Sequence, residues 1–259
     1  KLLNELPLSN RLIRETHKIL LQTVRGENKM PGDFRISQNW IGGSSLSSAK
    51  FIPPNYRYID ELMGDVERFI HNESNNVPHL IKIAILHYQF ETIHPFLDGN
   101  GRVGRLLITL YLVGQGILNK PALYLSDYLE RNRDEYYSHL TAIREKNQII
   151  PWIKFFLKGI ISTATNAKET FIKIIQLQKD MEVKLHSFGT KSEKINTILN
   201  SFYDTPILSV KDIVIITGIA DKTTRNMLEL MLEEGLIKEM TGYGRNKLFI
   251  FEKYFNLFK

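Results

Sequence analysis

The segment from His87 to Arg105, HYQFETIHPFLDGNGRVGR, most constrains how this chain folds. The apolar runs before it, Leu80 to Leu86, and after it, Leu106 to Leu112, have the spacing and length of helices. Between them lie Pro95 and the sequence Asp98-Gly99-Asn100-Gly101, whose residue types interrupt helices and tolerate left-handed dihedral angles. The segment therefore predicts a helix, a tight loop and a second helix.

The start of the second predicted helix has the features of a phosphate site. Gly99, Asn100 and Gly101 allow successive backbone N–H groups to converge where the helix dipole already favours an anion. Arg102 and Arg105 fall in the first helical turn, where cations without an anionic ligand oppose the dipole. Asp98 would repel a phosphate unless Mg²⁺ bridged the two, and Mg²⁺ normally binds one or two carboxylates plus phosphate oxygens. The loop therefore predicts a polyphosphate site with Mg²⁺ on Asp98.

His94 lies four residues before Asp98, where the first helix is expected to end. Its imidazole can accept a proton from a hydroxyl near neutral pH, although a lone histidine at a helix end is more often a cap. A zinc site from His87, His94 and Asp98 is disfavoured, because zinc takes three or four ligands and the chain has no cysteine. A hairpin at Asn100-Gly101 would need alternating strands, and no Gly-Lys-Ser/Thr follows the glycines as in a Walker loop. These neighbours favour His94 as a catalytic base.

Residues 94–105, HPFLDGNGRVGR, resemble the signature of the Fic family, HPFx(D/E)GNGRxxR, at every specified position. The segments LPLSNRLIRETHKILL, PGDFRISQNWIG, FIPP and LYLSDYLERNRDEYYSHL extend the resemblance over roughly residues 5 to 160. The resemblance implies a helical core that transfers AMP from ATP to Ser, Thr or Tyr hydroxyls of target proteins, with self-modification included. The reaction is called AMPylation.

The resemblance also implies roles for individual residues. His94 would deprotonate the target hydroxyl, and Asp98 would hold Mg²⁺ against the α and β phosphates. Residues 99–101 would cradle the phosphates, with Arg102 and Arg105 reaching the β and γ groups. Family members that transfer phosphate instead carry Lys where this chain has Gly101, so AMP transfer is favoured.

A family hairpin called the flap maps to about residues 42–54 and would pair with the backbone of the target. Its expected contacts with ATP and substrate are Ser48, Ala49, Lys50 and Phe51. Tyr136 and Tyr137 correspond to a tyrosine pair that packs near the adenine in relatives. Arg144 stands where some relatives have Asn, which leaves the adenine contacts open.

Many relatives inhibit themselves with a helix carrying (S/T)xxxE(G/N), whose Glu would pair with Arg105. The one formal match, Thr23 to Asn28, is interpreted as accidental because Gly26 and Pro31 indicate that the helix has ended. The sequence begins with Lys rather than Met, so we expect a fragment whose inhibitory helix lies upstream and which is more active than its parent. The sequence also leaves open the reverse activity, removal of AMP from a modified protein.

Helical periodicity extends over the rest of the first part of the chain. A helix beginning near Leu6 has Ser9 as its cap. Three more are expected at residues 56–71, from Pro78 to His94, and at 127–146. A long helix from Pro151 then runs towards His186. The apolar positions expected on the first helix are Leu8, Leu12, Ile13, Thr16, Ile19, Leu20 and Val24.

Residues 187–190 predict a boundary between a first domain, 1–186, and a second, 190–259. Helical patterns near residues 195–202, 210–216 and 221–234 precede β runs at 236–240 and 247–251, an order that resembles a winged helix. Both DNA binding and protein docking are open for it. The expected contact residues are Lys222, Thr223, Thr224, Arg225, Asn226, Tyr243, Arg245 and Lys247.

The predicted fold class is mainly α: a helical core with a small β-hairpin flap, followed by a winged helix. A net charge of +6 permits binding of ATP or nucleic acid, and the absence of cysteine excludes a disulfide framework and a thiol nucleophile. Without a membrane-spanning run we expect a cytoplasmic location. The leading hypothesis is a protein adenylyltransferase, and the alternative is a nucleotide-sensing transcriptional regulator that binds DNA. The target protein and the oligomeric state, a homodimer included, stay open.

Overall fold

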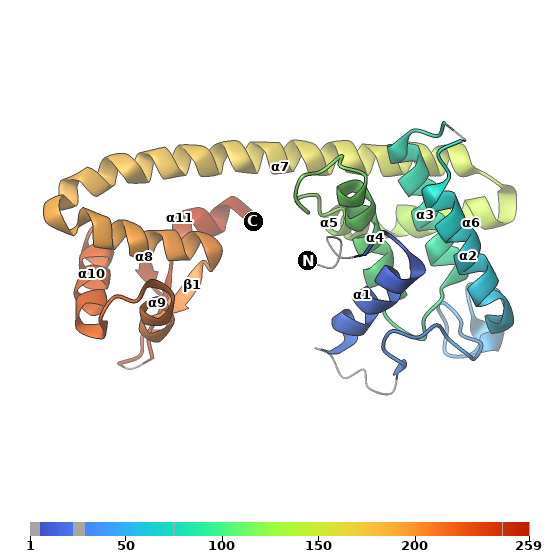
Figure 1. Ribbon diagram of the computed structural model, residues 1–259, viewed down its shortest axis with the longest axis horizontal. Coiled ribbons are helices and arrows are strands. Elements are labelled where there is room, and N and C mark those ends of the chain that lie inside the picture. Colours follow the sequence, from blue (N-terminus) through green and yellow to red (C-terminus); the bar gives the residue numbers. More distant parts are fainter. Residues whose placement is uncertain (1–5, 23–28, 75, 245, 259) are drawn as a thin grey trace. The chain divides into compact units, whose positions relative to one another are not determined.

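The computed structural model describes residues 6–22, 29–74, 76–244 and 246–258, and most of them are helical (Figure 1). Packing divides the chain into two compact units, residues 1–165 and 166–259. The division falls within the long helix α7 (Ile149–Leu185). The segment expected as the boundary, residues 187–190, follows this division and lies within η5 (His186–Lys191), a 3-10 segment in which Gly189 has φ of 55°. No described helix is both long enough and apolar enough to cross a lipid bilayer.

Unit 1 consists of helices in the order that the sequence predicts. The expected charged helix at residues 127–146 is in fact two helices, because the chain breaks at Asn132, whose side-chain amide donates to the Tyr128 carbonyl at 2.8 Å. The elements are α1 (Asn10–Gln22), η3 (Leu46–Ser48), η4 (Tyr56–Tyr58), α2 (Ile59–His71), α3 (His79–Ile93), α4 (Asn100–Gly114), α5 (Ser126–Arg131), α6 (Arg133–Lys146) and the first part of α7.

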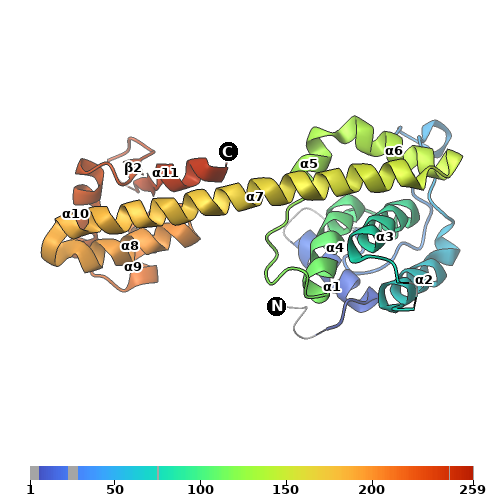
Figure 2. The same ribbon diagram turned by 90° about the horizontal axis from the view of Figure 1, so that it is seen from above.

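Helices α3 and α4 run side by side at the centre of unit 1 (Figure 2). Residues on nearly every side of α3 are buried, which is typical of a helix surrounded by other helices. The indole of Trp152, on α7, donates to the Ala84 carbonyl of α3 at 3.0 Å. This packing sets the end of α3 and the start of α4 beside each other, and residues 94–99 form the loop between them.

The buried face of α1 differs from the expectation. Leu12 and Ile13 are buried as expected, but Ile19 is 52% exposed, and the remaining core positions belong to His17 and Leu21. Ser9 does cap this helix, since its hydroxyl accepts the Leu12 N–H at 3.4 Å. Val24 lies outside the described residues.

Unit 2 has its own core and a three-stranded antiparallel sheet in the order β1-β3-β2. The three expected helices and both expected β runs are present, and β1, which pairs Leu208 with Phe249, was not expected. Ser209 and Asp212 form a reciprocal capping box at the start of α9. The elements are α8 (Ser192–Asp204), β1 (Ile207–Ser209), α9 (Val210–Thr217), α10 (Asp221–Glu233), β2 (Lys238–Glu239), β3 (Leu248–Ile250), α11 (Glu252–Phe255) and η6 (Asn256–Phe258).

Candidate active site at the start of α4

His94 is the residue after α3 and has a left-handed backbone conformation, with φ of 51° and ψ of 59°. This conformation is unusual for a residue other than glycine and requires support from its surroundings. Arg35 supplies that support, because its Nε donates to the His94 carbonyl at 2.9 Å, and Asn39 Nδ2 donates to the same oxygen at 3.4 Å. Neither Arg35 nor Asn39 was singled out from the sequence, because both lie in a segment with the composition of a loop.

The His94 side chain is half-buried, and its buried Nδ1 has no hydrogen-bond partner among the residues that the structure describes. Burial lowers the pKa of His94 from 6.5 to about 4, and the nearby Arg35 and Arg144 lower it as well. The imidazole is therefore neutral at pH 7 and has a nitrogen lone pair that can accept a proton. This state is the one that a general base needs.

The loop between His94 and α4 is held by Asn100. Its side-chain oxygen accepts the Phe96 N–H at 2.8 Å, and its Nδ2 donates to the Phe96 carbonyl at 2.7 Å. Because both polar groups of the buried amide are occupied, the side chain of Asn100 is committed to the loop. A phosphate would therefore meet the backbone of Asn100 rather than its side chain.

Gly99 caps α4 with a φ of 78°, a conformation that glycine adopts without strain. The first intrahelical hydrogen bond of α4 runs from Val103 N–H to the Gly99 carbonyl at 3.0 Å. The N–H groups of Asn100, Gly101 and Arg102 precede this bond and have no acceptor within the helix. Three such donors at the positive end of the helix dipole are the arrangement that an anion site needs. The phosphate site at this position stays a prediction, and these three residues are called the candidate anion site.

The two arginines of α4 both lie next to the candidate anion site. Arg102 is 4.0 Å from Asp98, measured from Nη2 to Oδ2, and it is partly exposed. Arg102 and Arg105 also line a cavity of about 210 Å³. Tyr124, which is 66% exposed and was not singled out from the sequence, lines the same cavity.

Asp98 is positioned by His17 from α1. The ring of His17 stacks on Phe96 at 3.8 Å and accepts the Gly32 N–H at Nδ1, so its Nε2 carries the proton and donates to the Asp98 carbonyl at 3.0 Å. Desolvation by burial lowers the pKa of His17, which is consistent with this neutral tautomer. A histidine on the apolar face of a helix was the only sequence signal for this role.

The carboxylate of Asp98 fits a magnesium site that a nucleotide would complete. Its Oδ1 accepts the Gly99 N–H at 2.6 Å, while Oδ2 is 4.0 Å from Arg102 Nη2. Over the described ranges, no cluster of three His, Asp or Glu side chains is arranged to hold a metal ion by itself. One half-exposed carboxylate beside an anion site is the donor set that Mg²⁺ uses when phosphate oxygens supply further ligands. His87 is unsuited to metal binding, because its ring nitrogens bond to the Gly104 carbonyl and the Tyr136 hydroxyl.

The flap is a short hairpin that closes with one antiparallel bridge, Ile41 to Phe51. Its turn contains η3, and the Ser48 hydroxyl accepts the N–H groups of Ser44 and Ser45 at 3.0 and 3.1 Å. A side chain at Gly43 would lie 2.2 Å from the Ser48 carbonyl oxygen, so this close approach requires glycine. The hydroxyl of Ser48 therefore stabilises the turn, while Lys50 is exposed and Ala49 is half-buried.

Phe51 and the tyrosine pair have different surroundings. The Arg144 guanidinium lies 3.7 Å from the centre of the Phe51 ring, a cation–π contact that links α6 to the flap. Tyr136 is buried, with its hydroxyl 3.0 Å from His87 Nε2, whereas Tyr137 is 46% exposed. Of the two residues expected near an adenine, only Tyr137 therefore offers an accessible ring.

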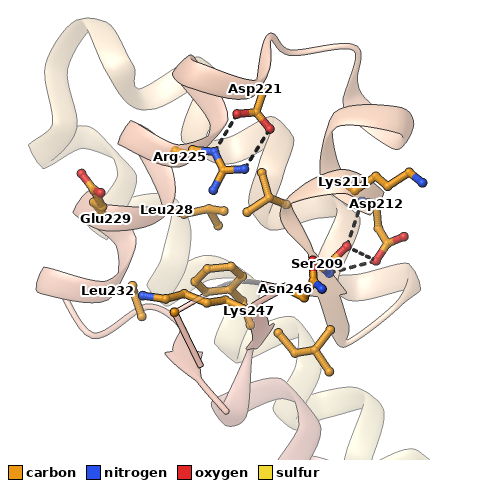
Figure 3. Close-up of a pocket in the computed structure, with 14 residues that line it drawn as sticks. Ser209, Lys211, Asp212, Asp221, Arg225, Leu228, Glu229, Leu232, Asn246 and Lys247 are labelled. Carbon is orange, nitrogen blue, oxygen red and sulfur yellow. Dashed lines mark hydrogen bonds and ion pairs between the residues drawn. The ribbon is translucent and has the colours of Figure 1, made fainter. Parts of the chain in front are cut away.

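Unit 2 contains a separate groove of about 510 Å³ between α9, α10 and β3 (Figure 3). Arg225, expected at a DNA contact, is held by Asp221 of the same helix at 2.6 Å. Thr224, expected beside it, is fully buried, so its placement on a contact face was wrong. Arg245 and the formal inhibitory match at residues 23–28 lie outside the described residues. The groove is lined by both basic and acidic side chains, Lys211, Arg225 and Lys247 with Asp212, Asp221 and Glu229.

Comparison with known proteins finds similarity to protein adenylyltransferases. A protein adenylyltransferase Fic from Drosophila grimshawi is 30% identical over 155 residues, which are 60% of this chain and 29% of that protein. A probable protein adenylyltransferase of Aquifex aeolicus is 39% identical over 119 residues, 46% of this chain and 32% of that protein. The chain thus spans less than a third of the length of these curated relatives.

Two solved structures share the fold. A Fic family protein from Desulfovibrio desulfuricans G20 has a TM-score of 0.53 and 22% identity, and covers 93% of this chain and 68% of its own. A Fic domain containing signalling protein from Bacteroides thetaiotaomicron has a TM-score of 0.50 and 21% identity, with 62% of each chain covered. Residues 7–112, which include α1, the flap, α3 and most of α4, match the Fic/DOC family. The match to the Fic/DOC family thus covers the part of the chain that contains His94, the loop and the start of α4.

Proposed function

We propose that this chain is a Mg²⁺-dependent protein adenylyltransferase that transfers AMP from ATP to Ser, Thr or Tyr hydroxyls of target proteins. The observation that carries the proposal is the pairing of a neutral, backbone-supported His94 with the three free N–H groups at the start of α4. The names of the relatives, protein adenylyltransferases that match up to 60% of this chain, support the same reaction.

In the proposed reaction, the target hydroxyl oxygen attacks the α phosphorus of ATP as its proton passes to the His94 imidazole. The bond between the α phosphorus and the bridging oxygen to the β phosphate breaks, and pyrophosphate leaves. A general base of this kind contributes roughly 10² to 10⁴ in rate. The backbone N–H groups of residues 100–102 and the Arg105 side chain bind the phosphates and orient the α phosphorus.

Mg²⁺ held by Asp98 would neutralise charge on the phosphates when bound. The flap would bind the target through its backbone. The N–H groups of residues 44, 45 and 48–50 are bonded within the hairpin, so the pairing would use its other backbone groups. Such pairing through the main chain orients an extended peptide without demanding a particular sequence. Phe51, packed under Arg144, would anchor the flap beside His94.

The test is transfer of label from α-labelled and, separately, γ-labelled ATP, with Mg²⁺, onto the protein itself and onto a cell lysate. We expect label only from the α position, lost by at least about 10² in His94→Ala. His186→Ala is the matched control, because His186 is exposed on η5 and should leave transfer unchanged. Transfer at the native rate by His94→Ala would refute the assignment of the base, and label from the γ position would show phosphate transfer instead.

We also propose that residues 190–259 are a winged-helix module that docks a protein partner. The order α8, β1, α9, α10, β2, β3 supports this topology, and the mixed charge of the groove in Figure 3 favours a protein over the phosphate backbone of DNA. The test is titration of the protein with duplex DNA at low and high salt. Tight binding that falls steeply with added salt would favour the alternative, a DNA-binding regulator.

A further inference from the structure

Glu91 is a buried acid that the proposed mechanism does not use. It lies on α3, three residues before His94, and is 7% exposed. Its Oε1 has no hydrogen-bond partner in the part of the chain that the structure describes. A buried carboxyl oxygen without a donor is unfavourable enough that its retention calls for an explanation.

The carboxyl of Glu91 lies against the glycines of α4. A Cβ at Gly104 would lie 2.4 Å from Glu91 Oε1, so in this conformation the carboxyl occupies space that a side chain at position 104 would need. The position of a Cβ at Gly101 is 4.0 Å from Glu91 Oε1 and 3.2 Å from Arg105 Nη1. The carboxyl of Glu91 and the guanidinium of Arg105 therefore face the same small space beside the first turn of α4, with no ion pair within 4.0 Å between them.

We propose that Glu91 is a positioning residue that competes with the nucleotide phosphates for Arg105, so that nucleotide binding takes up one proton at Glu91. This inference rests on the proposed function and deepens it. When Glu91 is ionised, it attracts Arg105 and repels phosphate in a site of low dielectric constant. When Glu91 is protonated, both effects disappear and Arg105 is free to bind the β and γ phosphates.

The other charged or titratable groups around Glu91 keep one state near neutral pH. Burial lowers the pKa of His87 and of His94 to about 4, so both rings are neutral. Burial raises the pKa of Tyr136, on α6, well above 10, so the phenol keeps its proton. Arg105 from α4 and Arg144 from α6 face the carboxyl as permanent cations.

Glu91 itself is the exception in this cluster. Burial raises the pKa of Glu91 to about 7, even though the charges of Arg105 and Arg144 oppose the rise. Both of its protonation states are thus populated near neutral pH in the free protein. An anion bound at the start of α4 would favour the protonated state.

The test is isothermal titration of the whole chain with α,β-methylene-ATP and Mg²⁺ between pH 6 and pH 8, in buffers that differ in heat of ionisation. This analogue blocks the bond that AMP transfer would break. We expect the wild-type Kd to rise about tenfold more than that of Glu91→Gln across this range, with uptake of up to one additional proton near pH 8. Protons that the nucleotide itself takes up or releases contribute equally in wild type and in each variant, so they cancel when the proteins are compared.

Glu145→Gln is the matched control, because Glu145 is exposed on α6 and its loss removes the same charge. It should behave as wild type. An equal pH dependence of Kd in wild type and Glu91→Gln would overturn this inference but not the proposed function. If none of the three proteins bound the analogue, the proposed function would be refuted as well. Carbon-13 NMR of the glutamate carboxyls in the wild-type protein, with and without the analogue, gives the same answer without a substitution. A Glu91 resonance that titrates at the same pH in both samples would also overturn the inference.

Discussion

Arg35 is the side chain on which the geometry of His94 depends most. It is 2% exposed, and its guanidinium donates to the carbonyls of His94 at 2.9 Å, Ser37 at 3.1 Å and Pro54 at 2.5 Å. It therefore ties the residue after α3 to the end of the flap. Removing it would leave these three carbonyl groups, and that of Ile93 at 3.4 Å, without this donor and would create a large void.

The expected effect of Arg35→Ala follows from these contacts. Each buried acceptor left without a donor costs about 1 to 3 kcal/mol, and water entering the void would satisfy part of the deficit. We expect the free energy of unfolding to fall by about 4 kcal/mol. Arg35→Lys keeps the charge but lacks the planar fork that reaches several carbonyls at once, so its loss should be smaller.

Urea unfolding measures the stability change, with Arg68→Ala as control, because the Arg68 and Asp65 side chains form an exposed pair and should contribute less than about 1 kcal/mol. The second readout is AMP transfer under conditions where each variant is folded. In Arg35→Lys we expect kcat to fall at least about tenfold with little change in KM for ATP, because His94 is displaced while the N–H groups of α4 remain. A stability loss below about 1 kcal/mol in Arg35→Ala, or a native kcat in folded Arg35→Lys, would refute this reasoning.

Three further predictions concern protons and the loop. Because the pKa of His94 is about 4, kcat/KM should fall on the acid side only as the pH approaches 4, rather than near the usual 6.5, and a pH profile checks this. Folding raises the pKa of Glu91 from 4.5 to about 7, so protonation of Glu91 favours the folded state at low pH. This contribution to the free energy of unfolding, about 3 kcal/mol, is lost as the pH rises from 4.5 through 7. Urea unfolding of wild type and Glu91→Gln at pH 5 and pH 8 should show it as a pH-dependent difference in stability between the two proteins. Asn100→Ala should weaken nucleotide binding and lower stability by about 2 kcal/mol, since both Phe96 backbone groups lose their partner; binding at the native affinity would contradict it.

Local sequence patterns were sufficient for the elements that carry the site. Apolar periodicity predicted α3 and α4, and the glycines with Asn100 predicted the loop between them, because backbone dihedral preferences and helix amphipathicity act over a few residues. The free N–H groups at the start of α4 also follow from the position of a helix start alone. The same local reasoning missed the break at Asn132 and placed Ile19 in the core, since it did not know which neighbours each helix face would meet.

The residues that fix the geometry of the candidate site are positioned by contacts between distant parts of the chain. Arg35 lies 59 positions from the His94 carbonyl that it binds, and His17 lies 81 positions from Asp98. Whether a polar side chain is a buried support or an exposed loop residue is decided by tertiary packing, which brings such positions together and removes water from them. The sequence by itself thus determined the helix, loop and helix that carry His94 and the candidate anion site. Only the tertiary structure decided which side chains hold His94 in place and left Glu91 buried next to Arg105.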